Sequence, residues 1–119
     1  MRIKGVGISL IDAERFRALR LRFGERLLKR FFSGQELEYC FSHRFPDPHL
    51  AGRMAAKIAF RKALGEIISF SNLEVRRGEQ GRPEIRLISG RPAQKDETFF
   101  LSISHSGRLA IAHVLIEGE

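Results

Sequence analysis

The pattern of apolar and polar residues predicts strands at the start and in the second half of the chain. In residues 2–12, Ile8 and Leu10 alternate with Ser9 and Ile11, which is the two-residue period of a strand with one buried face. Four later segments also have strand character, and turn residues separate the members of each pair: 73–76 with 84–87, and 99–104 with 109–116. Each pair is predicted to form an antiparallel hairpin.

A spacing of three and four residues predicts helices in the first half. Residues 13–31 carry an apolar stripe, interrupted near Gly24, that we interpret as core: Phe16, Leu19, Phe23, Leu27 and Phe31. Asp12 is the predicted N-cap of this segment. Ser33 and Glu36 have the spacing of a capping box, so a short helix is expected through Phe41.

A second strong helix is predicted over residues 49–64, after a loop at 45–48 that contains two prolines and before a stop at Gly65. Gly5 and Gly7 predict a close approach of another backbone to the first strand, and residues 90–97 read as a loop. Helices followed by antiparallel strands indicate an α+β fold. The length of 119 residues suits one domain, 1–119.

Composition and charge indicate where the protein is located in the cell and which kinds of partner it binds. No apolar run approaches the roughly 20 residues of a membrane span, and the N-terminus lacks the apolar block of a signal peptide, so we expect a cytoplasmic protein. Cys40 is the only cysteine; this excludes an internal disulfide and predicts a buried structural thiol. A net charge of +7 favours anionic partners: nucleic acid, an anionic cofactor or an acidic carrier protein.

Four sequence blocks, taken together, resemble the small trimeric holo-acyl-carrier-protein synthases, a family of 4'-phosphopantetheinyl transferases. The blocks are GVGISLIDAERF (5–16), LAGRMAAKIAFRKALG (50–65), the turn GRP (81–83) and LSISHS (101–106), which is followed by the apolar strand AIA (110–112). They occur in the order and spacing of the family and extend over most of the chain. The resemblance implies a 4'-phosphopantetheinyl transferase-like fold and a homotrimer with its sites between subunits.

The resemblance also implies a reaction. Such enzymes transfer the phosphopantetheine arm of coenzyme A to a serine of an acidic acyl carrier protein, a step of fatty acid biosynthesis, with the help of Mg²⁺. By position, Lys62 matches the residue at the transferred phosphate. The implied contacts with coenzyme A are Arg53, Lys62, Gly65, Ser104 and His105, and those with the carrier protein are Arg15, Arg22 and Arg26.

Two positions depart from the family pattern. The family places an aspartate at the position of Ser9 and a glutamate at that of Ile58, and these carboxylates hold the metal ion. A serine hydroxyl is a poor ligand for a hard cation and an isoleucine is none. Asp12, three residues after Ser9, is the nearest acid that could substitute, provided that the chain turns there.

Simpler interpretations stand beside these. Arg53, Lys57, Arg61 and Lys62 could form a solvated basic face, Ile58 could merely extend the apolar packing of its helix, and His105 could be a turn histidine bonded to backbone. Three functions follow: an active transferase with altered metal use, a degenerate homologue that binds coenzyme A or the carrier protein without transfer, or a nucleic-acid-binding protein. The last is the weakest, because few aromatic residues stand among the arginines to stack bases.

Overall fold

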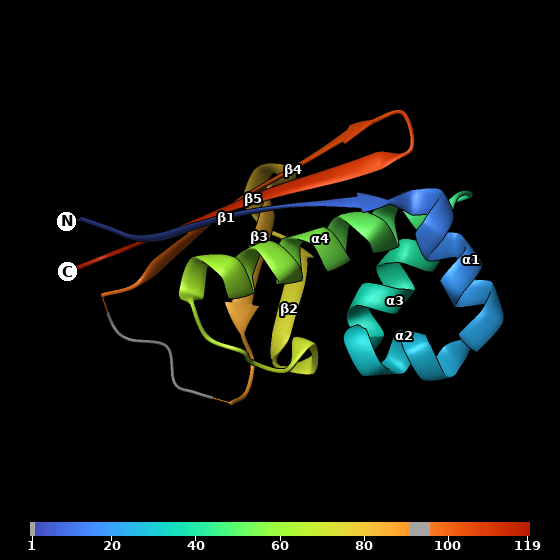
Figure 1. The fold of residues 1–119 in the computed structure, drawn as a ribbon, viewed down its shortest axis with the longest axis horizontal. Coiled ribbons are helices and arrows are strands. Elements are labelled where there is room, and N and C mark those ends of the chain that lie inside the picture. The colour runs from blue at the N-terminus through green and yellow to red at the C-terminus, as the bar shows by residue number, and fades with distance from the viewer. Residues whose placement is uncertain (1, 91–95) are drawn as a thin grey trace.

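The computed structural model describes residues 2–90 and 96–119, and its elements follow the predicted α+β order (Figure 1). The first half holds β1 (Arg2–Asp12), α1 (Ala13–Phe23), α2 (Glu25–Phe31), α3 (Gly34–Phe41) and α4 (Pro46–Leu64). The second half holds β2 (Leu73–Arg77), β3 (Pro83–Leu87), β4 (Thr98–Ser106) and β5 (Leu109–Gly118), with short 3-10 turns at Phe70–Asn72 and Glu79–Gly81. Most of the predicted loop 90–97 lies outside the described residues.

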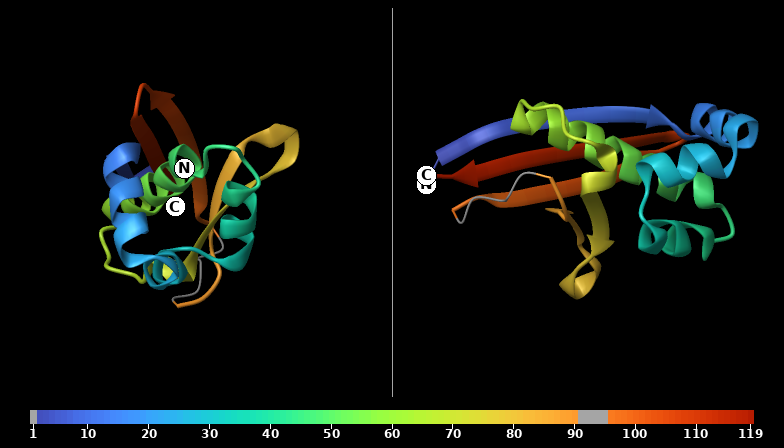
Figure 2. Two further views of the ribbon diagram at one scale, coloured as in Figure 1. Left: turned by 90° about the vertical axis from the view of Figure 1, so that its right-hand side faces the viewer. Right: turned by 90° about the horizontal axis from the view of Figure 1, so that it is seen from below.

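The strands form two antiparallel sheets, and α4 packs against the larger one. The larger sheet has the order β1-β5-β4, and β2 pairs only with β3 in a separate hairpin. The hairpin runs crosswise to the long strands, while α1, α2 and α3 gather at the end of the molecule that is far from both termini (Figures 1 and 2). All the predicted strand segments and both strand pairings are confirmed.

Two apolar clusters form the core. One lies between α4 and the two sheets, where Phe60 meets the ring of Phe99 at 4.9 Å. The other lies under the three short helices, where Phe16 packs edge-on against Phe32. Cys40 is fully buried in this second cluster, and this burial raises the pKa of its thiol to about 11. A buried structural role for Cys40 is therefore confirmed.

The expected interruption near Gly24 is present, but the prediction that Leu19 and Phe23 belong to the core was wrong. Leu19 is 47% exposed and Phe23 is 51% exposed, and Leu28 is buried instead. Leu19 and Phe23 both stand in α1, which buries only Ala13 and Phe16. Gly24, whose φ is 65°, then ends α1 and turns the chain before α2 begins. A stripe with helical spacing stays on one face only while the axis is continuous, so the break explains why Leu28 is the buried residue of α2.

The loop predicted at residues 45–48 is also corrected. The helix α4 begins at Pro46, and Phe45 is its N-cap. Proline is tolerated in the first turn of a helix because the N–H that it lacks would have no intrahelical partner there. Asp47 in this turn is buried and accepts a two-pronged hydrogen bond from Arg20, with an Nε–Oδ1 distance of 2.7 Å. This pair fixes α1 to the start of α4.

The close approach predicted at Gly5 and Gly7 is confirmed. A side chain at Gly5 would overlap the carbonyl oxygen of Ala63, and one at Gly7 would overlap that of Ala59. The strand β1 therefore lies directly on the backbone of α4, with glycines on one side and alanines on the other. At its far end α4 stops at Gly65, whose φ of 74° is the left-handed conformation expected of a glycine cap.

We expect Gly7→Ala to lower the free energy of unfolding by about 1–3 kcal/mol, because the added methyl group has no space and must push β1 off α4. Urea unfolding followed by circular dichroism measures the change. Gly34→Ala is the matched control, since the first residue of α3 has open space beside it. Equal losses in the two variants would contradict the tight contact.

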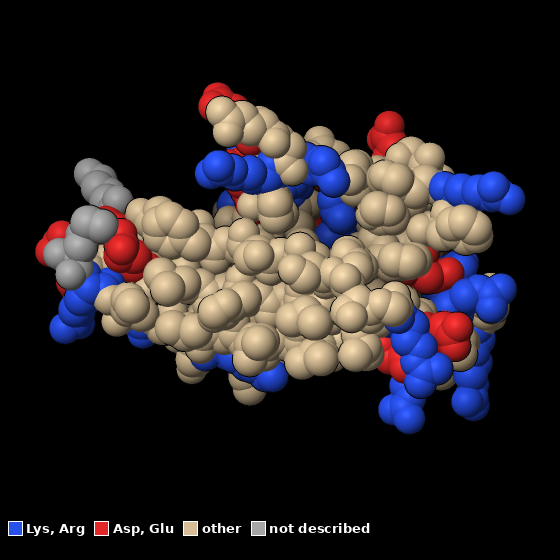
Figure 3. Space-filling model, turned by 90° about the horizontal axis from the view of Figure 1, so that it is seen from above, with Lys and Arg blue, Asp and Glu red and all other residues tan. Residues whose placement is uncertain are grey.

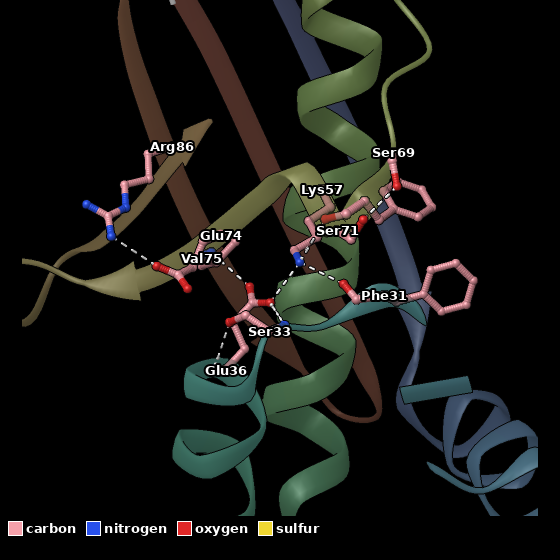
Figure 4. Close-up of polar contacts among 10 residues, drawn as sticks. Phe31, Ser33, Glu36, Lys57, Ser69, Ser71, Glu74, Val75 and Arg86 are labelled. Atoms are coloured by element: carbon pink, nitrogen blue, oxygen red, sulfur yellow. Dashed lines mark hydrogen bonds and ion pairs between the residues drawn. The ribbon is translucent and has the colours of Figure 1, made fainter. Parts of the chain in front are cut away.

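Lys57 lies in the interior, so the interpretation that includes it in a solvated basic face was wrong. Its ammonium is fully buried, and its pKa is lowered by burial, an effect that Glu36 opposes. The ammonium donates to three acceptors: Glu36 Oε1 at 2.7 Å, the Phe31 carbonyl at 2.7 Å and the Phe70 carbonyl at 3.2 Å (Figure 4). Three acceptors match the three N–H groups of a protonated lysine.

Glu36 is the other centre of this network. It closes the predicted capping box with Ser33, and its second oxygen accepts the backbone N–H of Val75 at 2.8 Å (Figure 4). One carboxylate therefore joins α3, α4 and β2.

No helix in residues 2–90 and 96–119 combines the length and the apolar character that crossing a bilayer requires.

Candidate functional site

Arg53 and His105 lie on neighbouring elements at the N-terminal half of α4. Arg53 is 7% exposed, and its guanidinium stacks over the Tyr39 ring of α3 at 4.1 Å. Its Nε is buried without a hydrogen-bond partner in the described part of the chain. His105 comes from the end of β4, and its Nε2 donates to the carbonyl of Pro48 at 3.0 Å. A buried cation with an unused donor is suited to an anionic ligand.

Two further histidines, which the sequence analysis did not single out, join this group. His43 and His49 stack face to face with ring centroids 3.8 Å apart, and the ring of His105 lies 6.5 Å from that of His49. Burial, followed by the charges of His43, Arg53 and other cations, lowers the pKa of His49 to about 4. His49 stands four residues before Arg53 on α4, a spacing that could have indicated it. His43 lies outside α4, so its contact with His49 depends on how the chain folds between α3 and α4.

Ser9 belongs to β1, and Ile58 and Lys62 belong to the C-terminal half of α4, on which β1 lies. Ser9 is buried on the inner face of β1, and Ile58 packs against the second apolar cluster. Lys62 is exposed one turn after Ile58, and its Nζ donates to the carbonyl of Ile8 at 3.0 Å. The described residues contain no group of three His, Cys, Asp or Glu side chains that could hold a metal ion.

Asp12, the predicted substitute ligand, is already engaged. Its carboxylate accepts the backbone N–H groups of Glu14 and Arg15 as the N-cap of α1, which confirms the capping prediction. It also pairs with Arg108 at 3.0 Å. Binding a cation there would compete with the start of the helix.

The structure separates two predicted coenzyme A contacts from Arg53 and His105 within one chain. Gly65 caps the opposite end of α4, about 18 Å from Arg53 along the helix axis. Ser104 is exposed and precedes His105 on β4. Successive strand residues point to opposite faces, so Ser104 lies on the outer face of the sheet.

A basic surface covers α1 and α2. The predicted docking residues Arg15, Arg22 and Arg26 are all exposed there, and Lys and Arg side chains gather at this end of the molecule (Figure 3). Arg15 also lines an apolar pocket of about 480 Å³, together with the exposed Leu19. Leu19, which was predicted to lie in the core, thus contributes to a mixed basic and apolar surface.

Known proteins with similar sequences cover almost the whole chain. Residues 5–113 match the family model of the 4'-phosphopantetheinyl transferase superfamily. The chain is 37% identical to the holo-[acyl-carrier-protein] synthase of Thermodesulfovibrio yellowstonii, covering 96% of this chain and 98% of the relative. It is 38% identical to the synthase of Listeria innocua, with 97% and 98% covered.

Solved structures agree as well. The holo-[acyl-carrier-protein] synthase of Neisseria meningitidis superposes with a TM-score of 0.85 at 30% identity, over 98% of this chain and 99% of the other. The Bacillus anthracis synthase, solved in complex with CoA (3',5'-ADP), gives a TM-score of 0.82 at 28% identity, with 98% of both chains covered. This chain therefore belongs to the holo-[acyl-carrier-protein] synthase family of the 4'-phosphopantetheinyl transferase superfamily.

Proposed function

We propose that this protein transfers 4'-phosphopantetheine from coenzyme A to a serine of an acyl carrier protein. The observation that carries the proposal is the cationic group around Arg53, a buried guanidinium with an unused donor beside His105. Such a group suits the phosphates at the nucleotide half of coenzyme A. Lys62 lies further along α4 and is the residue that would neutralise charge on the transferred phosphate. In this role Lys62 is the candidate catalytic residue. The reaction would take place in the cytoplasm.

A magnesium ion does not fit the residues present. Mg²⁺ takes carboxylate oxygens, whereas Ser9 and Ile58 supply none and Asp12 caps α1. We therefore derive no step that depends on a metal ion. The same observation favours a second candidate function, a homologue that binds coenzyme A or the carrier protein without transfer.

One experiment separates the two. The purified protein is incubated with coenzyme A and an apo acyl carrier protein, with Mg²⁺ in one series and EDTA in the other. Mass spectrometry then follows the carrier. A mass gain of one phosphopantetheine that accumulates over many turnovers, equally in both series, is expected for the transferase. An unmodified carrier, together with measurable binding of coenzyme A, would support the binding function instead.

The acidic carrier protein is proposed to dock on α1 and α2. Opposite charges accelerate such encounters, and an apolar side chain of the carrier could enter the pocket beside Leu19. The arginines Arg15, Arg22 and Arg26 are all exposed for this contact. Arg22 also lies over the ring of Phe23 at 5.3 Å, which keeps its charge at this surface.

Arg22→Glu is expected to weaken carrier binding by about tenfold at low ionic strength, since it replaces an attraction by a repulsion. Isothermal titration calorimetry with the apo carrier measures the affinity, and coenzyme A binding should not change. Arg2→Glu is the control, because it makes the same change in net charge at the other end of the molecule (Figure 1). An equal loss in both variants would indicate a net-charge effect without a defined docking surface.

We further propose a homotrimer assembled through the outer face of the large sheet. This face is almost free of charged side chains over its centre (Figure 3), and it exposes large apolar residues: Val6, Ile8, Leu10, Phe100 and Leu109. An apolar patch of this kind on a folded protein marks an interface. Ser104 lies on the same face, so assembly would bring it toward a neighbouring subunit. Light scattering should give three times the 13.6 kDa chain mass, and the mass of one chain would contradict the proposal.

A further inference from the structure

Three of the four histidines of the chain meet at one place. His43 precedes α4, His49 lies in its first two turns, and His105 ends β4. The rings of His43 and His49 are stacked, and the ring of His105 lies beside that of His49. The other groups that surround them are Tyr39 of α3, Arg53 of α4 and Arg77 of β2, which lies 5.7 Å from the centre of the Tyr39 ring.

The charge at this place has one sign. Every charged or titratable group that shifts the pKa of His49 electrostatically is a base: His43, Arg53, His105 and Arg77. No carboxylate among the described residues shifts the pKa of His49 electrostatically. The elements that meet here therefore create a positive potential at His49 that no carboxylate of residues 2–90 and 96–119 offsets.

The hydrogen bonds leave unused nitrogens on the rings. His43 Nδ1 donates to the carbonyl of Tyr39 at 2.9 Å, and His105 Nε2 donates to that of Pro48 at 3.0 Å. In a neutral imidazole the second nitrogen carries a lone pair, and it becomes a donor only when it is protonated. His49 makes no hydrogen bond within the described residues. An anion at this place would meet lone pairs at neutral histidines and donors at protonated ones.

We propose that His43 and His49 extend the Arg53–His105 group into a phosphate site that takes up a proton when coenzyme A binds. This inference rests on the proposed function, because it takes coenzyme A as the ligand. The free protein keeps His49 neutral, since burial and four neighbouring bases oppose its charge. A phosphate between these groups cancels the repulsion and accepts the new N–H donor. Arg53 Nε, which has no hydrogen-bond partner among the residues that the structure describes, supplies a further donor.

The sign of the pH dependence follows from this uptake. Because the complex holds more protons than the free protein, coenzyme A binds more tightly as the pH falls from about 7.5 toward 5, by up to about tenfold per pH unit for each proton taken up. The enhancement ends near the free pKa of about 4, where His49 is already protonated without the ligand. His49→Phe retains the stacked ring and removes the titrating nitrogen.

Proton NMR of the imidazole Cε1–H signals tests the proposal, with the His49 signal assigned from its absence in His49→Phe. Saturation with coenzyme A should move the titration midpoint of His49 upward by about 1–3 pH units. Calorimetry from pH 5 to 7.5 should show a smaller pH dependence of the affinity in His49→Phe. Coenzyme A that binds without moving the His49 midpoint would overturn the inference and leave the proposed function standing. Coenzyme A that does not bind at any of these pH values would overturn the proposed function itself.

Discussion

The double variant Ser9→Asp with Ile58→Glu is expected to transfer phosphopantetheine at least about 100-fold faster than the wild type in the presence of Mg²⁺, and to lose this gain in EDTA. The two carboxylates would stand on β1 and α4, the two elements that Lys62 joins through its hydrogen bond to Ile8. They would supply the oxygen ligands that Mg²⁺ prefers, and a metal ion that neutralises phosphate oxygens contributes several kcal/mol to such a reaction. Rates measured by mass spectrometry of the carrier test this.

A second measurement does not depend on activity. Ser9 is buried, so an aspartate there is unfavourable until a cation pairs with it. Millimolar Mg²⁺ should therefore raise the melting temperature of the double variant and leave that of the wild type unchanged. Ser9→Asn with Ile58→Gln is the control, since it has nearly the same size without the charge. A double variant that binds Mg²⁺ but remains inactive would show that the phosphate site has also changed.

Lys57→Met is expected to lower the free energy of unfolding by about 3–5 kcal/mol, because it leaves the Glu36 carboxylate charged and buried. Domains of this size have a total stability of about 5–15 kcal/mol, so the variant should be close to unfolding at 37 °C. Urea titration followed by circular dichroism at 25 °C measures the loss. Adding Glu36→Gln should recover part of it by removing the unpaired charge.

The control for this prediction is Lys29→Met. Lys29 pairs with Glu25 at 3.6 Å, but both side chains are largely exposed, and such pairs contribute about 0.5 kcal/mol. The same substitution at two ion pairs therefore separates burial from charge. If Lys57→Met were as mild as Lys29→Met, water would have to reach the Glu36 carboxylate, contrary to the contacts in Figure 4.

The features that local spacing determines could be predicted from the sequence. The capping box at Ser33, the glycine stop at Gly65 and both hairpins depend on residues close in the chain. The contact of Gly7 with α4 was also predictable, because a glycine inside an apolar strand indicates a close backbone. In the candidate site, the positions of Arg53 and Lys62 on one helix followed from the same kind of evidence.

The remaining features depend on which segments meet in space. Lys57 has the sequence context of a surface residue, and only the return of α3 and β2 onto α4 encloses it. Leu19 and Phe23 have core spacing, but α1 buries only Ala13 and Phe16 and leaves them at the surface. The stack of His43 on His49 requires the link between α3 and α4 to fold back. Neither spacing nor composition contains that information.

The glycine contact between β1 and α4 has a consequence for the size of ligand that this protein accepts. Because the backbones touch at Gly5 and Gly7, the helix lies as close to the strand as two backbones can lie. Arg53 and Lys62 both stand on α4, so the geometry of the helix holds them about 14 Å apart along its axis, and the glycine contact holds this helix against β1. A ligand can therefore contact both cations only if the distance between two of its phosphate groups matches this separation. Analogues of coenzyme A with a longer or shorter link between those groups should reach one cation and miss the other.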